Sequence, residues 1–250
     1  MPVIGCKCEV CRSNDPLDHR LRCSALVETD ATRLLIDCGP DFRQQILPQP
    51  FSPIHGVLLT HVHYDHCGGL DDLRPYCSFG EINVYADNNT AKGLMRAIPY
   101  CFAEHRYPGV PAIHLNTIEP HQPFTIGDVQ VTPFTVMHGS LPITAYRLVQ
   151  RSAEGEPQHV LTYITDMKTI ADEEMPLLQG TDTLVVNALR FTKQHHSHQT
   201  AEEAVSFARR TGARRSFLIH VCHDIGLHRD ANSKLPADIQ LAYDGQTVML

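Results

Sequence analysis

Four residues of types that bind metal ions lie within six positions of the sequence, in the run His61-Val-His63-Tyr-Asp65-His66. The run directly follows the apolar segment 56–60, which is typical of a buried strand. A strand end projects alternate residues to one side, so His61 and His63 can face one metal, and the turn that follows can aim Asp65 and His66 at a second. Imidazole nitrogen and carboxylate oxygen suit zinc, manganese or iron. The run therefore predicts a two-metal centre rather than a decorated surface loop.

Three further polar residues stand at the carboxyl ends of apolar runs downstream. His138 follows the run 129–136, Asp166 follows the run 160–165, and His220 follows the run 216–219. One such residue is more often a satisfied polar group than a ligand. Three with the same placement, together with the histidine run, favour additional ligands of the same metal centre.

A second cluster of metal-binding residue types lies near the N-terminus, where Cys6, Cys8 and Cys11 form Cys-x-Cys-x-x-Cys. The chain has nine cysteines, an odd number, and no secretion signal, which argues for metal thiolates over disulfides. Three thiolates within six residues suit one tetrahedral zinc, which needs a fourth ligand. The alternatives are that Cys222 supplies this ligand, or that the cysteines are reduced and inert.

Short β-like runs and helical stretches alternate along the chain, which predicts an α/β layered architecture and a single domain over residues 1–250. Segments 24–29 and 33–37 flank a short polar turn and predict a hairpin. A helix is clearest at 200–211, where Thr200 and Glu203 form a capping-box pattern and Gly212 is a fitting stop. Further strands are expected at 56–60, 82–86, 129–136, 144–149, 160–165, 183–188 and 216–219, and further helices at 89–97 and 171–178.

Composition and charge narrow the class of protein. The 250 residues are 42% hydrophobic and 20% charged, with a net charge of −7, so no global field for nucleic acid is indicated. No apolar run reaches the roughly 20 residues that a membrane span needs, and no basic-then-apolar leader precedes the first motif. These features predict a cytoplasmic protein without a membrane or nucleic-acid partner, and they leave a homodimer open.

The combined pattern of histidines and aspartates resembles that of the metallo-β-lactamase-fold hydrolases. The likeness covers nearly the whole chain and includes Ile36-Asp37-Cys38-Gly39 upstream of the run. It implies an αββα sandwich with the metals at one edge of two facing sheets. By position, it assigns His61, His63 and His138 to one metal and Asp65, His66 and His220 to the other, with Asp166 bridging both.

Within that superfamily, the N-terminal cysteines resemble those of the phosphoribosyl cyclic phosphodiesterases, the PhnP-like group. That group pairs such a trio with a histidine three residues after the last catalytic-metal histidine, a position held here by His223. The resemblance therefore implies one structural zinc on Cys6, Cys8, Cys11 and His223.

The same resemblance implies a histidine that acts on the leaving group beside the metals. Alignment to the helix start assigns this role to His198, a residue type suited to protonating a departing alkoxide. His195 and His196 are more simply parts of an exposed polar turn. Asp65 and His198 are thus the residues expected to take part most directly in catalysis.

Two departures from the group qualify the match. Its members usually carry a strand and a Gly-Thr-Gly loop before the cysteine trio, whereas this chain starts at Met1-Pro2-Val3, so an N-terminal strand is either missing or dispensable. Asn187 also stands at a strand end where close relatives are expected to have aspartate, which puts a supporting contact in question.

Three other residues have two open interpretations each. Asp37 either orients a ligand imidazole or is a plain turn aspartate. Arg43 and Arg190 either grip a phosphate, which guanidinium matches with two hydrogen bonds, or form surface ion pairs.

The resulting functional hypothesis is a phosphodiesterase that uses two divalent metals, zinc or manganese, and a hydroxide that bridges them. The expected substrate is a small phosphodiester, such as a cyclic ribose phosphate. One alternative is a tRNA 3′-end-processing ribonuclease, although the chain is acidic and shows no long basic or glycine-rich arm. The other is thioester hydrolysis of the glyoxalase II kind, although no helical C-terminal domain is evident.

Overall fold

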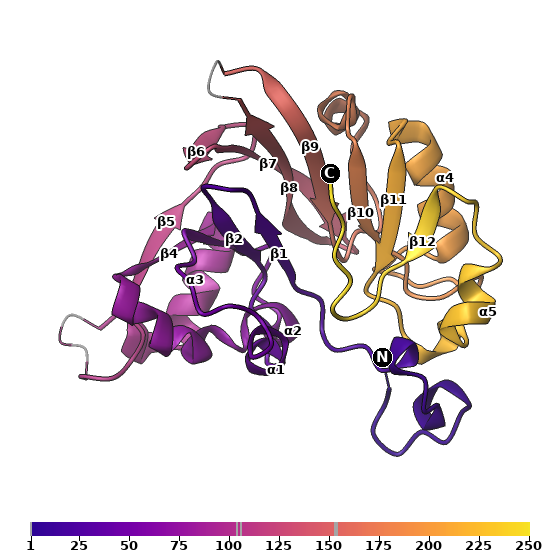
Figure 1. Cartoon of the computed structure of the whole chain (residues 1–250), viewed down its shortest axis with the longest axis horizontal. Helices are drawn as coiled ribbons and strands as arrows, with labels where there is room; N and C mark the ends of the chain where they lie inside the picture. The colour runs from indigo at the N-terminus through magenta and orange to yellow at the C-terminus, as the bar shows by residue number, and fades with distance from the viewer. Residues whose placement is uncertain (1, 104, 106, 153–154) are drawn as a thin grey trace. The chain divides into compact units, whose positions relative to one another are not determined.

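The computed structural model describes residues 2–103, 105, 107–152 and 155–250 (Figure 1). The chain forms two compact units. Unit 1 comprises Met1–Leu21 and Phe134–Leu250, and unit 2 comprises Arg22–Pro133. The histidine run lies in unit 2, and all the other candidate ligands lie in unit 1.

Unit 2 is built on a five-stranded sheet in the order β1-β2-β3-β4-β5. Strands β1 and β2 form the antiparallel hairpin that the sequence predicts, and β2 to β5 run parallel. Because the carboxyl ends of parallel strands meet at one edge of a sheet, the segments that follow β2 and β3 come together there. The bounds are β1 Ala25–Glu28, β2 Arg33–Ile36, α1 Phe42–Ile46, β3 Gly56–Leu58, α2 Tyr64–Cys67, η3 Leu70–Phe79, β4 Ile82–Ala86, α3 Asn88–Ala97, η4 Pro99–Cys101 and β5 Ile113–Thr117.

A seven-stranded sheet has the order β12-β11-β10-β9-β8-β7-β6. Strands β9 to β12 run parallel, so Asp166, Asn187 and His220 all stand at the same edge of unit 1, at the carboxyl ends of β9, β10 and β11. Strand β7 begins in unit 2 and ends in unit 1 at His138. The bounds are β6 Phe124–Ile126, β7 Val129–His138, β8 Leu141–Arg151, β9 Pro157–Ile164, η5 Asp172–Leu178, β10 Thr183–Asn187, α4 Ala201–Thr211, β11 Arg215–Ile219, η6 His223–Ile225, α5 His228–Asn232 and β12 Ile239–Leu241, and η1 Val10–Arg12 and η2 Pro16–Asp18 precede the first sheet.

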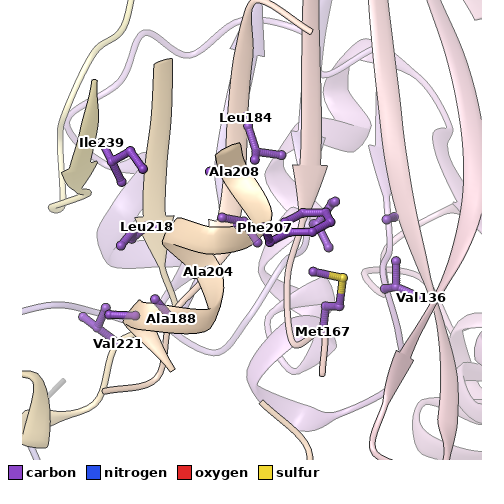
Figure 2. Close-up of a cluster of buried hydrophobic side chains, with 14 of the residues drawn as sticks. Val136, Met167, Leu184, Ala188, Ala204, Phe207, Ala208, Leu218, Val221 and Ile239 are labelled. Carbon is purple, nitrogen blue, oxygen red and sulfur yellow. The ribbon is translucent and has the colours of Figure 1, made fainter. Parts of the chain in front are cut away.

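The apolar core of unit 1 forms where α4 lies against β10 and β11 (Figure 1). The helix buries Ala204 and Phe207, which are three positions apart and therefore share one side of it. They belong to the same cluster as Leu184 of β10 and Leu218 of β11 (Figure 2). Burial of a large apolar side chain contributes about 1.5–3 kcal/mol, so this cluster is a strong constraint on the strand ends that carry the candidate ligands.

The ends of α4 follow the sequence prediction closely. The Thr200 hydroxyl accepts a hydrogen bond from the Glu203 backbone N–H at 3.2 Å, and the Glu203 carboxylate accepts one from the Thr200 N–H at 2.8 Å. Gly212 ends the helix with φ of 68°, a conformation that glycine adopts at little cost. The predicted capping box and stop are confirmed.

The prediction of a helix at 171–178 is only partly right, because Asp172–Leu178 forms a 3-10 helix. Pro176 lies inside it and lacks the backbone N–H that an α-helix would use there. None of the helices in the described parts of the chain combines the length and apolar character that a membrane crossing requires.

The N-terminal segment of unit 1 is anchored to α5 by charged groups. Asp15 accepts a hydrogen bond from the Arg229 guanidinium at 2.8 Å. Asp18, which is buried, accepts one from the His228 backbone N–H at 2.7 Å and another from the Ser13 hydroxyl at 2.6 Å. These contacts hold the cysteine-bearing segment beside the C-terminal part of the chain.

Candidate metal centre

The histidine run of unit 2 is held in place by the segment that follows β2. The Cys38 N–H donates to the His66 carbonyl at 2.8 Å, and the Gly69 N–H donates to the Cys38 carbonyl at 2.8 Å. A Cβ added to Gly39 would lie 2.2 Å from the Asp65 carbonyl oxygen, so only glycine allows these two segments to approach so closely. The backbone conformation of the run therefore depends on the segment after β2 as well as on its own sequence.

Asp37 orients the imidazole of His66. Its carboxylate accepts a hydrogen bond from His66 Nδ1 at 2.7 Å, and both side chains are fully buried. Since Nδ1 donates, Nε2 is the nitrogen left for a metal. Of the two interpretations of Asp37, the structure supports the orienting residue and not the plain turn aspartate.

His61 is oriented by the same carboxylate through one hydroxyl. The Thr60 hydroxyl donates to Asp37 at 2.9 Å, so its oxygen is available to accept from His61 Nδ1 at 3.0 Å. His61 Nε2 lies 2.9 Å from Nδ1 of His63, so the two rings direct nitrogens at one point, as the alternation in the run predicts. Asp65 lies beside them, with a carboxylate oxygen 3.4 Å from His66 Nε2.

The candidate ligands of unit 1 stand where the backbone leaves its strands in an unusual conformation. Asp166 and His220 have φ of 55° and 53°, in the left-handed region that non-glycine residues rarely adopt. Asp37 in unit 2 shares this feature, with φ of 58°. Such backbone strain persists only where the surroundings enforce it, and it gathers at functional sites.

A carboxylate lies between two imidazoles in unit 1. Asp166 Oδ1 is 3.3 Å from His220 Nε2, and Asp166 Oδ2 is 3.3 Å from His198 Nε2. The rings of His198 and His220 are stacked, with centroids 5.0 Å apart. Burial is the main cause that lowers the pKa of His198, and the nearby His220 and His138 add to it, while Asp166 opposes the shift.

His138 is brought to the same place from the end of β7. Its Nδ1 donates to the Ser197 carbonyl at 2.9 Å, which leaves Nε2 for a metal. Its ring packs edge-on against His198, with centroids 4.6 Å apart. The predicted residues His138, Asp166, His198 and His220 thus form one group within unit 1.

Two residues make supporting contacts that the sequence leaves in question or does not predict. The first is Asn187, whose amide oxygen accepts from the Met167 N–H at 2.7 Å and whose amide nitrogen donates to the Met167 carbonyl at 3.0 Å. An aspartate carboxylate could not donate the second bond, so the asparagine amide fits this position and holds the Met167 backbone next to Asp166. The second is His195, whose Nδ1 lies 3.1 Å from Nδ1 of His198, although the sequence favours an exposed turn for it.

The cysteine trio meets a histidine more than two hundred residues further along the chain. His223 Nδ1 lies 3.3, 3.4 and 3.6 Å from the sulfurs of Cys6, Cys8 and Cys11. The Cys11 backbone N–H and then His223 lower the pKa of the Cys8 thiol to about 6, whereas burial raises the pKa of Cys11. Within the described chain, His223 and not Cys222 joins the group of metal-binding atoms.

Both kinds of site fit the metals that their donors suggest. Zinc bonds of about 2.3 Å to sulfur and 2.0 Å to nitrogen, at a tetrahedral angle, separate the two atoms by about 3.5 Å, close to the spacing around His223. At the histidine centre, Nδ1 of His61, His66 and His138 is in each case hydrogen-bonded to an oxygen atom. This pattern of orienting contacts is usual behind metal-binding imidazoles. The histidine and aspartate residues each offer one atom that could hold a metal.

The two candidate phosphate-binding arginines differ in their surroundings. The Arg190 guanidinium donates to the carbonyls of Lys193 and Gln194 and lies 3.3 Å from Asp224, so it braces its own loop. The structure therefore favours the ion-pair interpretation for Arg190. Arg43 is exposed, at a shallow hollow that Asp41 also lines.

Comparison with known proteins places this chain in a family. The model of the beta-lactamase superfamily domain matches residues 32–221, so the chain belongs to that family. The match includes the histidine run, the three downstream ligands and Asp37. With its mixed sheets and helices, the protein has the metallo-β-lactamase fold, and the predicted α/β class is confirmed.

Particular relatives narrow this class. The chain is similar to the crystal structure of "a New Diphosphatase from the PhnP Family", with a TM-score of 0.86, 35% identity, and coverage of 98% of this chain and 90% of the other. It also has the fold of Zn(2+)-bound PqqB from Methylobacterium extorquens, with a TM-score of 0.78, 21% identity, and coverage of 99% and 95%. The protein thus has a metallo-β-lactamase-fold domain and is similar to a member of the PhnP family.

One relative is much longer than this chain. It is named octanoyltransferase, comes from Porphyromonas gingivalis (strain ATCC BAA-308 / W83), and is 44% identical over 246 residues, which are 98% of this chain and 48% of the relative. The chain therefore spans about half of the length of that relative.

Proposed function

We propose that this protein is a metal-dependent phosphodiesterase that hydrolyses a small phosphodiester, such as a cyclic ribose phosphate. The observation that carries the proposal is the group of His198, Asp166 and His220, where each carboxylate oxygen meets a different imidazole at 3.3 Å. The arrangement places the Asp166 carboxylate, whose oxygens can bind metal, directly beside the His198 imidazole, a type of group that can transfer a proton. The 35% identity to a PhnP-family diphosphatase supports phosphate chemistry.

We propose that two divalent ions, zinc or manganese, bind to the ligands that the family resemblance implies. Nitrogen and oxygen donors of this kind suit either ion. When bound, such a pair lowers the pKa of a water molecule and polarises phosphoryl oxygens. That resemblance assigns His61, His63 and His138 to one ion and Asp65, His66 and His220 to the other, with Asp166 shared by both.

The chain's own side chains supply the remaining steps. In its imidazolium form His198 carries a proton at Nε2 and delivers it to the oxygen of the leaving group as the P–O bond breaks, which leaves the neutral ring. Asp65 is the only carboxylate of the histidine run, and we propose that it acts beside the reacting phosphate. Asp37 and Ser197 keep the ligand rings in fixed orientations through Nδ1, so little reorganisation accompanies the reaction.

Cys6, Cys8, Cys11 and His223 are proposed to hold one structural zinc apart from the reaction. All four donors are protein atoms, which is typical of a closed structural site with no position for substrate. The zinc would connect the N-terminal segment to η6, three residues after His220.

A second candidate activity is suggested by the names of two relatives. Similarity to a diphosphatase at 35% identity favours cleavage of a phosphoanhydride. The relative named octanoyltransferase favours acyl or thioester chemistry instead. Since the chain spans about half of the octanoyltransferase relative, that name describes a larger protein and supports acyl chemistry more weakly. The RNA-processing alternative would require a surface for tRNA, against which the net charge of −7 argues.

A substrate panel tests the proposal. Purified protein loaded with zinc or manganese is assayed against cyclic ribose phosphates, linear phosphodiesters, dinucleoside diphosphates, tRNA precursors and acyl thioesters. We expect the highest kcat/KM on a small phosphodiester, with an Asp166→Ala preparation as the control for contaminating hydrolases. Turnover of thioesters or tRNA precursors alone would overturn the proposal.

A further inference from the structure

The loop between β10 and α4 carries a histidine that contacts the proposed proton donor from behind. His195 Nδ1 lies 3.1 Å from His198 Nδ1, and their ring centroids are 4.9 Å apart. The opposite nitrogen of His198, Nε2, faces Asp166 at 3.3 Å. His198 is therefore held at both ends of its ring, by the carboxylate on one side and by His195 on the other.

The position of His195 is fixed by its own loop. The Arg190 guanidinium donates to the Lys193 carbonyl at 2.8 Å and to the Gln194 carbonyl at 3.2 Å, which closes the loop just before His195. The Ser197 backbone N–H then donates to His195 Nδ1 at 3.3 Å. His195 is half-buried, unlike its neighbour His196, which is exposed.

The contact between the Nδ1 atoms of His195 and His198 is a hydrogen bond with one donor and one acceptor. At 3.1 Å one nitrogen donates and the other accepts, and because His195 Nδ1 already accepts from the Ser197 N–H, the donor is His198 Nδ1. This bond fixes the tilt of the His198 ring and keeps Nε2 directed at Asp166. The Ser197 hydroxyl lies 3.2 Å from Nδ1 of both rings, so it can stabilise the pair but does not replace the direct contact.

We propose that His195 is a positioning residue for His198, which it holds through Nδ1 so that Nε2 points to the reacting group. The inference rests on the proposed function, because it assumes that His198 serves the leaving group. It gives His195 a role in supporting His198, whereas the sequence indicates a role for His198 and an exposed turn for His195.

The first test measures the histidine ring directly and does not depend on turnover. The nitrogen resonances of His198 are recorded by NMR in protein labelled with 15N-histidine, and a His198→Gln variant assigns them. We expect His195→Ala to shift the Nδ1 resonance of His198, because the hydrogen-bond partner is gone. His195→Asn should restore most of the wild-type shift, since its amide can donate or accept at the same position, and His196→Ala is the matched control. An unmoved Nδ1 resonance in His195→Ala would overturn the proposal.

The second test separates positioning from a general structural role. On a phosphodiester with an alkyl leaving group, His195→Ala should lower kcat by about 10–100-fold, the usual cost of losing an orienting partner. On a nitrophenyl ester, whose leaving group needs no proton, the loss should be below about threefold, and His195→Asn should recover most of the alkyl activity. Equal losses on both esters would show a structural role and overturn the proposal. If the wild type cleaves no phosphodiester, the proposed function fails, and the NMR result still decides the role of His195.

Discussion

The two units hold their candidate ligands in different ways. In unit 2 the ligands are nearly consecutive, and two neighbouring residues, Asp37 and Thr60, orient the rings of His61 and His66. In unit 1 each ligand comes from a different strand end, and Asp166 and His220 adopt left-handed backbone conformations.

This difference indicates what each half depends on. The arrangement in unit 2 follows from a short segment and one adjacent strand. The arrangement in unit 1 requires the assembled sheet, the 190–198 loop and the buried amide of Asn187. We therefore expect unit 1 to be the more sensitive half to changes outside the ligands themselves.

The largest effect is expected for Asp166→Ala, because this carboxylate contacts two imidazoles and is proposed to bridge both metals. Turnover should fall to background, and elemental analysis should show fewer metals than the roughly three per chain expected for the wild type, two at the dinuclear centre and one structural zinc. Circular dichroism should confirm that the fold is kept. Wild-type turnover at saturating manganese or zinc would contradict the bridging role.

The next effect is expected for His198→Ala in unit 1. Loss of a proton donor should lower turnover by about 10²–10⁴-fold on alkyl phosphodiesters, and far less on a nitrophenyl ester. Metal content should stay unchanged, because His198 is not among the proposed ligands. A loss of metal would make His198 a ligand instead.

An intermediate effect is expected in unit 2 for Asp37→Ala. His66 would lose the acceptor of its Nδ1 hydrogen bond, and metal affinity should fall by about 10–100-fold. The change is measured by competition with a chelator, and the exposed Asp30→Ala variant from the same hairpin is the matched control. An unchanged affinity would remove the orienting role of Asp37.

The zinc site provides a contrast within unit 1, because its four donors are all protein atoms. Cys6→Ser should lower the metal content by about one ion per chain and leave the other metals in place. Elemental analysis of gently purified protein measures this. If Cys6→Ser carried as much metal as the wild type, Cys6 would not be a zinc ligand, and the proposed cysteine site would be contradicted.

The smallest effect is expected for Asn187→Asp. A carboxylate cannot donate to the Met167 carbonyl, and an unsatisfied buried carbonyl costs about 1–3 kcal/mol of the free energy of unfolding. Denaturant unfolding measures the change, and Asn89→Asp on the exposed part of α3 serves as a control. Equal midpoints for both variants would show that the amide pair contributes nothing to unit 1.

Much of the architecture was predictable because its signals are local. Strand β4 and the hairpin of β1 and β2 lie where their apolar patterns predict, and the capping box of α4 is present. Strands β5, β6 and β12 were missed, because each is short and mixes polar with apolar residues, as in the sequence Ile-His-Leu-Asn-Thr of β5. At Asp172–Leu178 the acidic first turn is typical of a helix start, but Pro176 lacks the backbone N–H that an α-helix would use, and the segment forms a 3-10 helix.

The sequence by itself determined which residues could bind metals, because side-chain type and the spacing of a strand end suffice to recognise His61 and its neighbours. It also determined the strand ends that carry Asp166 and His220. Only the tertiary structure decided the partners of those residues. His195 meets His198, and Cys6 meets His223 across 217 positions, because loops and parallel strands bring distant segments together. Such meetings follow from the packing of the sheets, and no local pattern encodes them.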